Sequence, residues 1–171
     1  GGGFAFFERN NPFTISTWLK VDSVKTVGSL IHKSNAVMNG YRGWNLFREA
    51  DSTMRLTLSH VWPDNAIELQ TIEKFPLRQW AHIAFTYDGL SKANGTKLYI
   101  NGKEAKVTVV NDNLTQSLQY GKNKSNWYMD NLIVGRLSDQ MTKNFAIDEL
   151  KIYARSLTPL DIWGLYTGKN E

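Results

Sequence analysis

The fold of this chain is indicated first by one stretch of its sequence, Gln79-Trp80-Ala81-His82-Ile83-Ala84-Phe85-Thr86-Tyr87-Asp88-Gly89. From Ala81 to Tyr87 every second residue is apolar, and Asp88-Gly89 ends the run with a turn signal. A period of two is typical of a β-strand that turns one face to a core. The same alternation occurs at 13–20 and 54–59. These segments predict antiparallel strands.

Turn and cap signals divide the rest of the chain. Asn101-Gly102 stands between Leu98-Tyr99-Ile100 and Lys103-Glu104-Ala105, and because both residues accept positive φ, the pair predicts a two-residue hairpin. Helix signals gather at 156–166: a capping residue, a proline at the first helical position and an acid in the first turn, with Leu160, Trp163 and Tyr166 at helical spacing. The predicted fold class is therefore all-β: ten or more short strands in two packed sheets, with one short C-terminal helix on the sheet.

Length and composition exclude several classes of protein. A chain of 171 residues with 42% hydrophobic and 21% charged residues fits one globular domain. No apolar run approaches the ~18 residues of a membrane span, so direct membrane insertion is not expected. The absence of cysteine excludes disulfides and zinc ribbons within the chain. The net charge of +4 is scattered along the sequence, which argues against a nucleic-acid partner.

Longer motifs carry a resemblance to a known family. They are residues 12–20 (PFTISTWLK), 79–89 followed by 97–103 (KLYINGK), and 145–157 (FAIDELKIYARSL). In order and spacing they resemble the laminin-G-like, concanavalin A-like lectin/glucanase jelly-roll domains. Residues 7–13, 41–44 and 60–66 are similar to the version found in large exported bacterial proteins. The resemblance implies a two-sheet antiparallel jelly-roll sandwich over 1–171, a single domain from a larger protein that is secreted, periplasmic or on the cell surface.

The resemblance includes enzymes, but the acids that they need are missing. Glucanases on this fold place three acids at alternating positions of one strand, so that paired carboxylates share a cleft. The nearest approach is Glu49-Ala50-Asp51, and Thr53 and Met54 stand where a third acid is needed. Asp148 and Glu149 are adjacent, and a strand sends adjacent side chains to opposite faces. We therefore expect no catalytic residues, and acids brought together from distant loops remain the alternative.

The candidate ligand site combines aromatic and polar residues from two segments, Tyr41, Arg42 and Trp44 and then His60, Trp62, Asp64 and Asn65. If 44–47 and 54–59 are consecutive strands, their ends bring the two segments together. Binding pockets combine apolar walls with a few convergent polar groups, and aromatic faces stack on the C–H surfaces of sugars. Trp127 and Tyr128 form a second candidate platform. The alternative is that Trp44 and Trp62 belong to the core and that Arg42 pairs with an acid.

Asp148 shares a predicted strand face with Leu150 and Ile152, which places a carboxylate on the core side. Such a group needs hydrogen bonds, a cation or a metal to compensate its charge. In related domains an acid near this strand helps to hold calcium, so the resemblance implies at most one structural calcium ion, with Asp148 as a ligand. The alternative, which we favour, is that Asp148 accepts hydrogen bonds from backbone amides of a neighbouring loop.

Together, the residues and the resemblance predict a non-catalytic, lectin-like carbohydrate-binding accessory module of a secreted or surface bacterial protein. Its expected partners are a polysaccharide or glycan and the other domains of the parent protein. A second hypothesis is a structural or protein–protein interaction domain for adhesion or spacing, because laminin-G-like folds also serve in this way.

Overall fold

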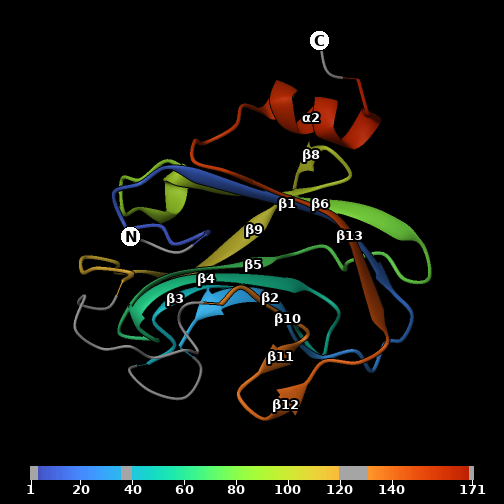
Figure 1. Cartoon of the computed structure of the whole chain (residues 1–171), viewed down its shortest axis with the longest axis horizontal. Coiled ribbons are helices and arrows are strands. Elements are labelled where there is room, and N and C mark those ends of the chain that lie inside the picture. The colour runs from blue at the N-terminus through green and yellow to red at the C-terminus, as the bar shows by residue number, and fades with distance from the viewer. Residues whose placement is uncertain (1–3, 36–39, 120–130, 170–171) are drawn as a thin grey trace.

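Two antiparallel sheets lie face to face, and an α-helix covers the outer side of one of them (Figure 1). The computed structural model describes residues 4–35, 40–119 and 131–169. Within these residues the predicted jelly-roll sandwich with a C-terminal helix is confirmed.

The chain passes several times from one sheet to the other. The five-stranded sheet has the order β13-β1-β6-β7-β8, with β1 (Phe13–Val21), β6 (Trp80–Tyr87), β7 (Thr96–Ile100), β8 (Lys103–Glu104) and β13 (Phe145–Tyr153). The six-stranded sheet has the order β10-β2-β3-β4-β5-β9, with β2 (Gly28–Ser34), β3 (Gly43–Arg48), β4 (Met54–Val61), β5 (Asn65–Thr71), β9 (Val107–Asp112) and β10 (Ile133–Val134). A separate hairpin consists of β11 (Arg136–Leu137) and β12 (Gln140–Met141), and η1 (Ala93–Gly95) is one turn of 3-10 helix.

The core lies between the sheets and is built from the apolar side of the alternation. The five-stranded sheet contributes residues such as Ile15 and Phe85, and the six-stranded sheet contributes residues such as Leu46 and Leu56, each at most 1% exposed. Trp44 of β3 packs edge-on against Phe85 of β6, with ring centroids 5.5 Å apart. This contact joins the two sheets, and because a buried aromatic is worth about 3–5 kcal/mol against alanine, such contacts hold the sandwich together.

The predicted hairpin and helix are both present. Asn101 and Gly102 have φ of 50° and 76° in the turn between β7 and β8. Helix α2 (Pro159–Thr167) begins with a capping box, in which Thr158 Oγ1 accepts from the Asp161 amide and the Asp161 carboxylate accepts from the Thr158 amide. No helix in the described ranges is long and apolar enough to cross a membrane.

The predicted packing stripe of α2 needs correction. Ile162 is the fully buried residue of the helix, whereas Leu160 is 72% exposed. Tyr166 does pack on the sheet as expected, 5.8 Å from the ring of Trp18. The helix lies over β8 at the edge of the sheet (Figure 1), so its contact face turns toward Ile162 and Leu160 is left outside.

A β-bulge in β13 changes the face on which Asp148 lies. Between the pairs Ser16↔Lys151 and Trp18↔Asp148, two residues of β13 oppose one residue of β1, and Glu149 has a φ of 47°. Because one extra residue resets the alternation, Ile147 and Leu150 both pack against the core while Asp148 is exposed. The prediction that Asp148 lies on the core side is wrong for this reason.

Candidate functional site

The six-stranded sheet turns its second face away from the core, toward the β11–β12 hairpin (Figure 1). In β3, β4 and β5, the residues that alternate with the core residues point their side chains to this outer face. The antiparallel register sets them in two rows across the three strands, Asn45–Thr57–Glu68 and Phe47–Arg55–Gln70. Residues from three separate parts of the sequence are thereby brought onto one surface.

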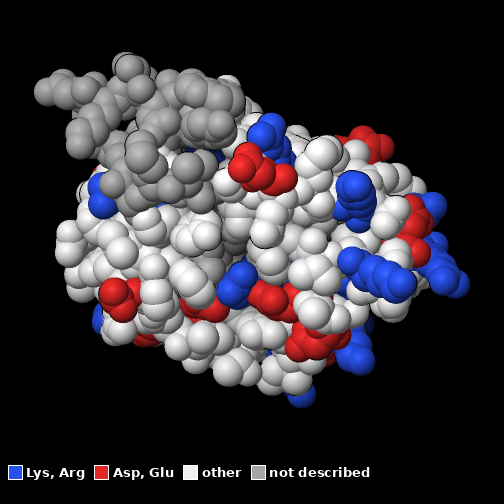
Figure 2. Space-filling model, turned by 90° about the horizontal axis from the view of Figure 1, so that it is seen from below, with Lys and Arg blue, Asp and Glu red and all other residues white. Residues whose placement is uncertain are grey.

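Beside these rows the surface is hollowed, with a cavity volume of about 210 Å³. We call this cavity the sheet-face hollow, and its lining consists of Tyr41, Asn45, Phe47, Arg55, Thr57, Trp62 and Leu137. Figure 2 views the molecule from this side and shows acidic and basic side chains next to one another beside a depression in the surface. The cavity is therefore open to solvent and carries both apolar walls and charged groups.

Trp62 forms one wall of the hollow. It follows the end of β4, precedes Pro63 across a cis peptide bond, and is 37% exposed. Its Nε1 donates a hydrogen bond to Glu68 Oε2 at 2.5 Å, and the ring of Tyr41 meets it edge to face at 6.1 Å. The hydrogen bond and the ring contact fix the indole plane while part of it stays open to solvent, as a stacking surface requires.

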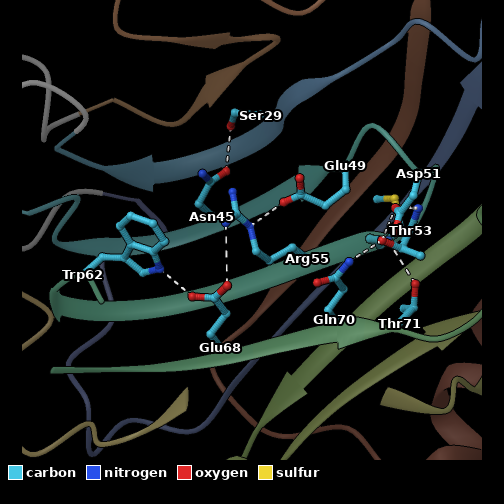
Figure 3. Close-up of polar contacts among 11 residues, drawn as sticks. Ser29, Asn45, Glu49, Asp51, Thr53, Arg55, Trp62, Glu68, Gln70 and Thr71 are labelled. Carbon is cyan, nitrogen blue, oxygen red and sulfur yellow. Dashed lines mark hydrogen bonds and ion pairs between the residues drawn. The ribbon is translucent and has the colours of Figure 1, made fainter. Parts of the chain in front are cut away.

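Arg55 lies at the centre of the charged groups (Figure 3). Its Nε is 2.8 Å from Glu49 Oε1, and its Nη1 is 3.6 Å from Glu68 Oε1. The guanidinium also lies over the ring of Phe47, 4.6 Å from the centroid, and 5.7 Å from the centroid of Trp62. Ion pairs and cation–π contacts together hold this planar group in one orientation.

Asn45 adds hydrogen-bond donors to the hollow. Its Oδ1 accepts from the Ser29 hydroxyl at 2.6 Å, which fixes the amide and turns its Nδ2 to the other side (Figure 3). A side-chain amide has two N–H donors on that nitrogen. The amide of Asn45 and the guanidinium of Arg55 thus supply donors to the hollow, and the carboxylate of Glu68, behind the lining, holds Arg55 and Trp62.

A polar row continues from Arg55 along the same face (Figure 3). Gln70 Nε2 donates to Thr53 Oγ1 at 2.7 Å, and the Thr53 hydroxyl and amide both donate to Asp51 Oδ1. These bonds from Thr53 lower the pKa of the Asp51 carboxyl. The side chains of this row mainly bind each other, so the groups available to a ligand are those around Trp62.

Two predicted site residues, Tyr41 and Trp62, are brought together in the hollow, as shown above. Arg42 and His60 instead bind each other: Arg42 Nε donates to the His60 carbonyl at 3.0 Å, and Arg42 Nη2 is 2.8 Å from His60 Nε2. His60 Nδ1 lies 2.7 Å from the Ser117 carbonyl. Since a carbonyl only accepts and a guanidinium only donates, Nδ1 carries the proton and the pair ties the 113–119 loop to the sheet.

Asn65 has a similar structural role. Its Nδ2 donates to Thr115 Oγ1 at 2.7 Å, and its Oδ1 accepts from the amides of Thr115 and Gln116. Asp64 is exposed in the turn that precedes it. Neither residue lines the hollow.

Trp44 is not a ligand-binding residue in this fold. It is 2% exposed and lies in the core, where its Nε1 donates to the Ala5 carbonyl at 3.3 Å. Its neighbours Asn45 and Phe47 occupy the open face instead, because alternation places only every second residue of β3 there. Trp127 and Tyr128 lie outside the described residues.

The residues present do not fit the calcium site that the sequence suggested. Asp148 is exposed, and its Oδ1 accepts from the backbone amide of Glu149 at 2.7 Å. Within 4–35, 40–119 and 131–169, no group of three or more His, Asp or Glu side chains could hold a metal ion. Calcium binding with Asp148 as a ligand stays a prediction, and the melting temperature with chelator and with added calcium tests it.

Sequence reasoning missed Asn45, Phe47, Arg55 and Glu68. The signal for Arg55 was present, because it alternates with the core residues Met54 and Leu56. Alternation does not predict the register between strands. The register pairs Asn45 with Thr57 and Thr57 with Glu68, which places the three residues in one row.

A two-sheet antiparallel sandwich of this strand order defines the jelly-roll class of domains. Consistently, a sequence model of the concanavalin A-like lectin/glucanases superfamily matches residues 5–163. The chain belongs to this superfamily. None of the curated proteins compared with the chain matches it.

Solved structures with the same fold include proteins of several kinds. A heptameric SAP-like pentraxin from Limulus polyphemus matches with a TM-score of 0.56 and 16% identity, over 91% of this chain and 70% of that one. A protein from Bacteroides ovatus to which carbohydrate binding has been ascribed matches with a TM-score of 0.58 and 14% identity, over 90% of this chain and 40% of that one. A sialidase from Trypanosoma rangeli matches with a TM-score of 0.60 and 14% identity, over 92% of this chain and 23% of that one. At these identities the likeness shows the fold alone, and the chain spans less than half of the last two proteins.

Proposed function

We propose that this chain is a non-catalytic, lectin-like carbohydrate-binding domain that holds a glycan in the sheet-face hollow. The observation that carries the proposal is the partly exposed indole of Trp62 beside the fixed polar groups of Arg55, Glu68 and Asn45. A sugar ring presents an apolar C–H face and a rim of hydroxyl groups. The hollow offers a matching aromatic wall and matching donors and acceptors.

The charged groups of the hollow support binding rather than hydrolysis. Glycoside hydrolysis needs one carboxyl group to protonate the leaving oxygen and a second one to attack or to activate water. Glu49 and Glu68 are both ion-paired with Arg55, and Glu68 also accepts the Trp62 N–H. Both carboxylates therefore act as partners of the protein's own groups, an arrangement that holds Arg55 and Trp62 in place.

The setting we propose is a secreted, periplasmic or cell-surface protein in which this domain is one of several. The ligand would be an external polysaccharide, and the other domains of the parent protein would be its covalent partners. The carbohydrate binding ascribed to the Bacteroides ovatus protein of the same fold supports the proposal as an analogy.

The test is binding to a panel of immobilised polysaccharides, with wild type, Trp62→Ala and Trp80→Ala. Trp80 is a matched control, because it is also a partly exposed tryptophan (45%) but belongs to β6 of the other sheet. A central aromatic contact is worth about 2–4 kcal/mol, so Trp62→Ala should weaken binding about 30-fold or more while Trp80→Ala leaves it unchanged. Equal binding by all three proteins would contradict the proposal that the glycan binds at Trp62.

A second candidate function is a protein-interaction or spacer domain, and α2 favours it. Leu160 and Trp163 are 72% and 42% exposed. They border an open cavity of about 540 Å³ whose other walls include Tyr153 and Leu157. If no polysaccharide of a broad panel binds, this surface becomes the better candidate for the function of the domain.

A further inference from the structure

We infer that the sheet-face hollow selects neutral sugars and rejects sugars that carry a carboxylate or sulfate group. This inference rests on the proposed function and names its ligand class. Its basis is a set of three ion-paired side chains among the described residues in and beside the hollow: two carboxylates, Glu49 and Glu68, face one guanidinium, Arg55. The net charge of this set is +1 − 2 = −1.

Arg55 is the group that would be expected to attract an anionic sugar, but its charge is already balanced. Its Nε lies 2.8 Å from Glu49 and its Nη1 3.6 Å from Glu68. The face of the guanidinium is covered by the ring of Phe47 at 4.6 Å. A second anion at Arg55 would have to displace one of these carboxylates or share the cation with both of them.

Glu68 is not free to move away from such an anion. Its side chain is only 7% exposed, its Oε2 is bound to Trp62 Nε1 and its Oε1 faces Arg55. Because water screens a buried charge weakly, a sugar carboxylate stacked on Trp62 would be repelled at short range. The residue that orients the indole is thus also the residue that rejects an anion.

A neutral sugar meets no such repulsion and satisfies the groups present. Its hydroxyls can accept hydrogen bonds from the Asn45 amide, which lines the hollow. Thr57 and Tyr41 add hydroxyl groups at the wall of the hollow. The small volume of the hollow, about 210 Å³, suits one sugar ring.

The experiment compares polymers of the same sugar configuration and linkage that are neutral or charged at C6: methyl-esterified against free polygalacturonate, and β-1,4-linked mannan against β-1,4-linked polymannuronate. Affinity is measured at low and at high salt. We expect the neutral member of any pair that binds to bind at least tenfold tighter than the charged one. Its affinity should change little with salt, because exposed charge–charge attraction is what salt weakens.

The double variant Glu49→Gln with Glu68→Gln tests the cause, because it changes the charged set from −1 to +1. The amide introduced by Glu68→Gln would keep an acceptor oxygen for Trp62, and Glu49→Gln alone keeps the test possible if the double variant fails to fold. The preference for neutral polymers should then be lost or reversed. The matched control removes two charges from the other sheet, Glu104→Gln with Glu149→Gln, and should keep the preference.

Three results would overturn the inference, and they differ from one another. Wild type that binds the charged member of a pair as tightly as the neutral one refutes the selectivity while leaving carbohydrate binding in place. A neutral preference that survives in both glutamine variants refutes the assigned cause. Failure of wild type to bind any neutral or charged polymer refutes the proposed function and the inference together.

Discussion

Acid should destabilise this protein through His82, which lies in β6 on the outer face of the five-stranded sheet. The residue is 1% exposed, its Nε2 is 2.7 Å from Ser16 Oγ, and its Nδ1 is buried with no hydrogen-bond partner among the described residues. The rings of Trp18 and Tyr166 pack at 5.5 and 6.2 Å. Burial lowers the pKa of His82 to about 4, the nearby Lys151 ammonium adds to this, and Glu149 opposes it.

The direction of the pH effect follows from this lowered pKa. The unfolded chain takes up the proton near the usual pKa of 6.5, whereas the folded chain resists it down to about 4. The stability contributed by neutral His82 is therefore complete above pH 6.5 and is lost as the pH falls toward 4. At 1.36 kcal/mol per unit the full loss is about 3 kcal/mol, of which about 2 kcal/mol falls between pH 7 and pH 5.

The assay is urea unfolding followed by tryptophan fluorescence at pH 7, 6 and 5, for wild type and His82→Gln. Glutamine can keep a hydrogen bond to Ser16 but does not titrate. The variant should be less stable at pH 7, and its further loss down to pH 5 should be about 2 kcal/mol smaller than that of wild type. The buried His32, whose pKa is also lowered by burial, titrates in both proteins and cancels. An equal loss in both proteins would refute the reasoning.

Gly102→Ala should destabilise the domain by about 1–2 kcal/mol, because φ is +76° and a Cβ would lie 2.9 Å from Trp163 and 3.0 Å from Tyr166. The control is Gly168→Ala, because Gly168 has a similar φ of +70° but an added Cβ would meet nothing within 4 Å. Its melting temperature should fall less than that of Gly102→Ala, since only the backbone strain is present. An equal fall in both variants would contradict the predicted clash. Incubation with the polysaccharides that bind should release no reducing sugar. Release that disappears in Glu68→Gln would make the hollow a catalytic site.

Much of the fold could be predicted from local patterns. The alternation at 81–87 and at 54–59 became β6 and β4, and Asn101-Gly102 became a hairpin. These signals are reliable because they act between neighbours in the chain: the pleat sends adjacent side chains to opposite faces, and a tight turn needs positive φ. Trp62 was likewise predicted for the site from its place in a Pro-containing turn among polar residues.

The rest of the site depends on contacts between distant segments. Trp44 and Trp62 look alike in the sequence, yet one packs on Phe85 in the core and the other opens to solvent beside Glu68. His60 and Arg42 suited a ligand by residue type, but they bind each other and the 113–119 loop. Residue type indicates which hydrogen bonds and ring contacts these groups can make, and only their neighbours in the fold decide which of them are made.

The sequence by itself determined which segments become strands, where the tight turn and the helix cap lie, and that the chain forms a jelly-roll sandwich. The tertiary structure alone decided the register that places Glu68 beside Arg55 and the bulge at Glu149 that turns Asp148 outward. The physical reason is that alternation is a property of one strand. Register and bulges arise only when strands pair: β4 pairs with its chain neighbours β3 and β5, and β13 pairs with β1 at the other end of the chain.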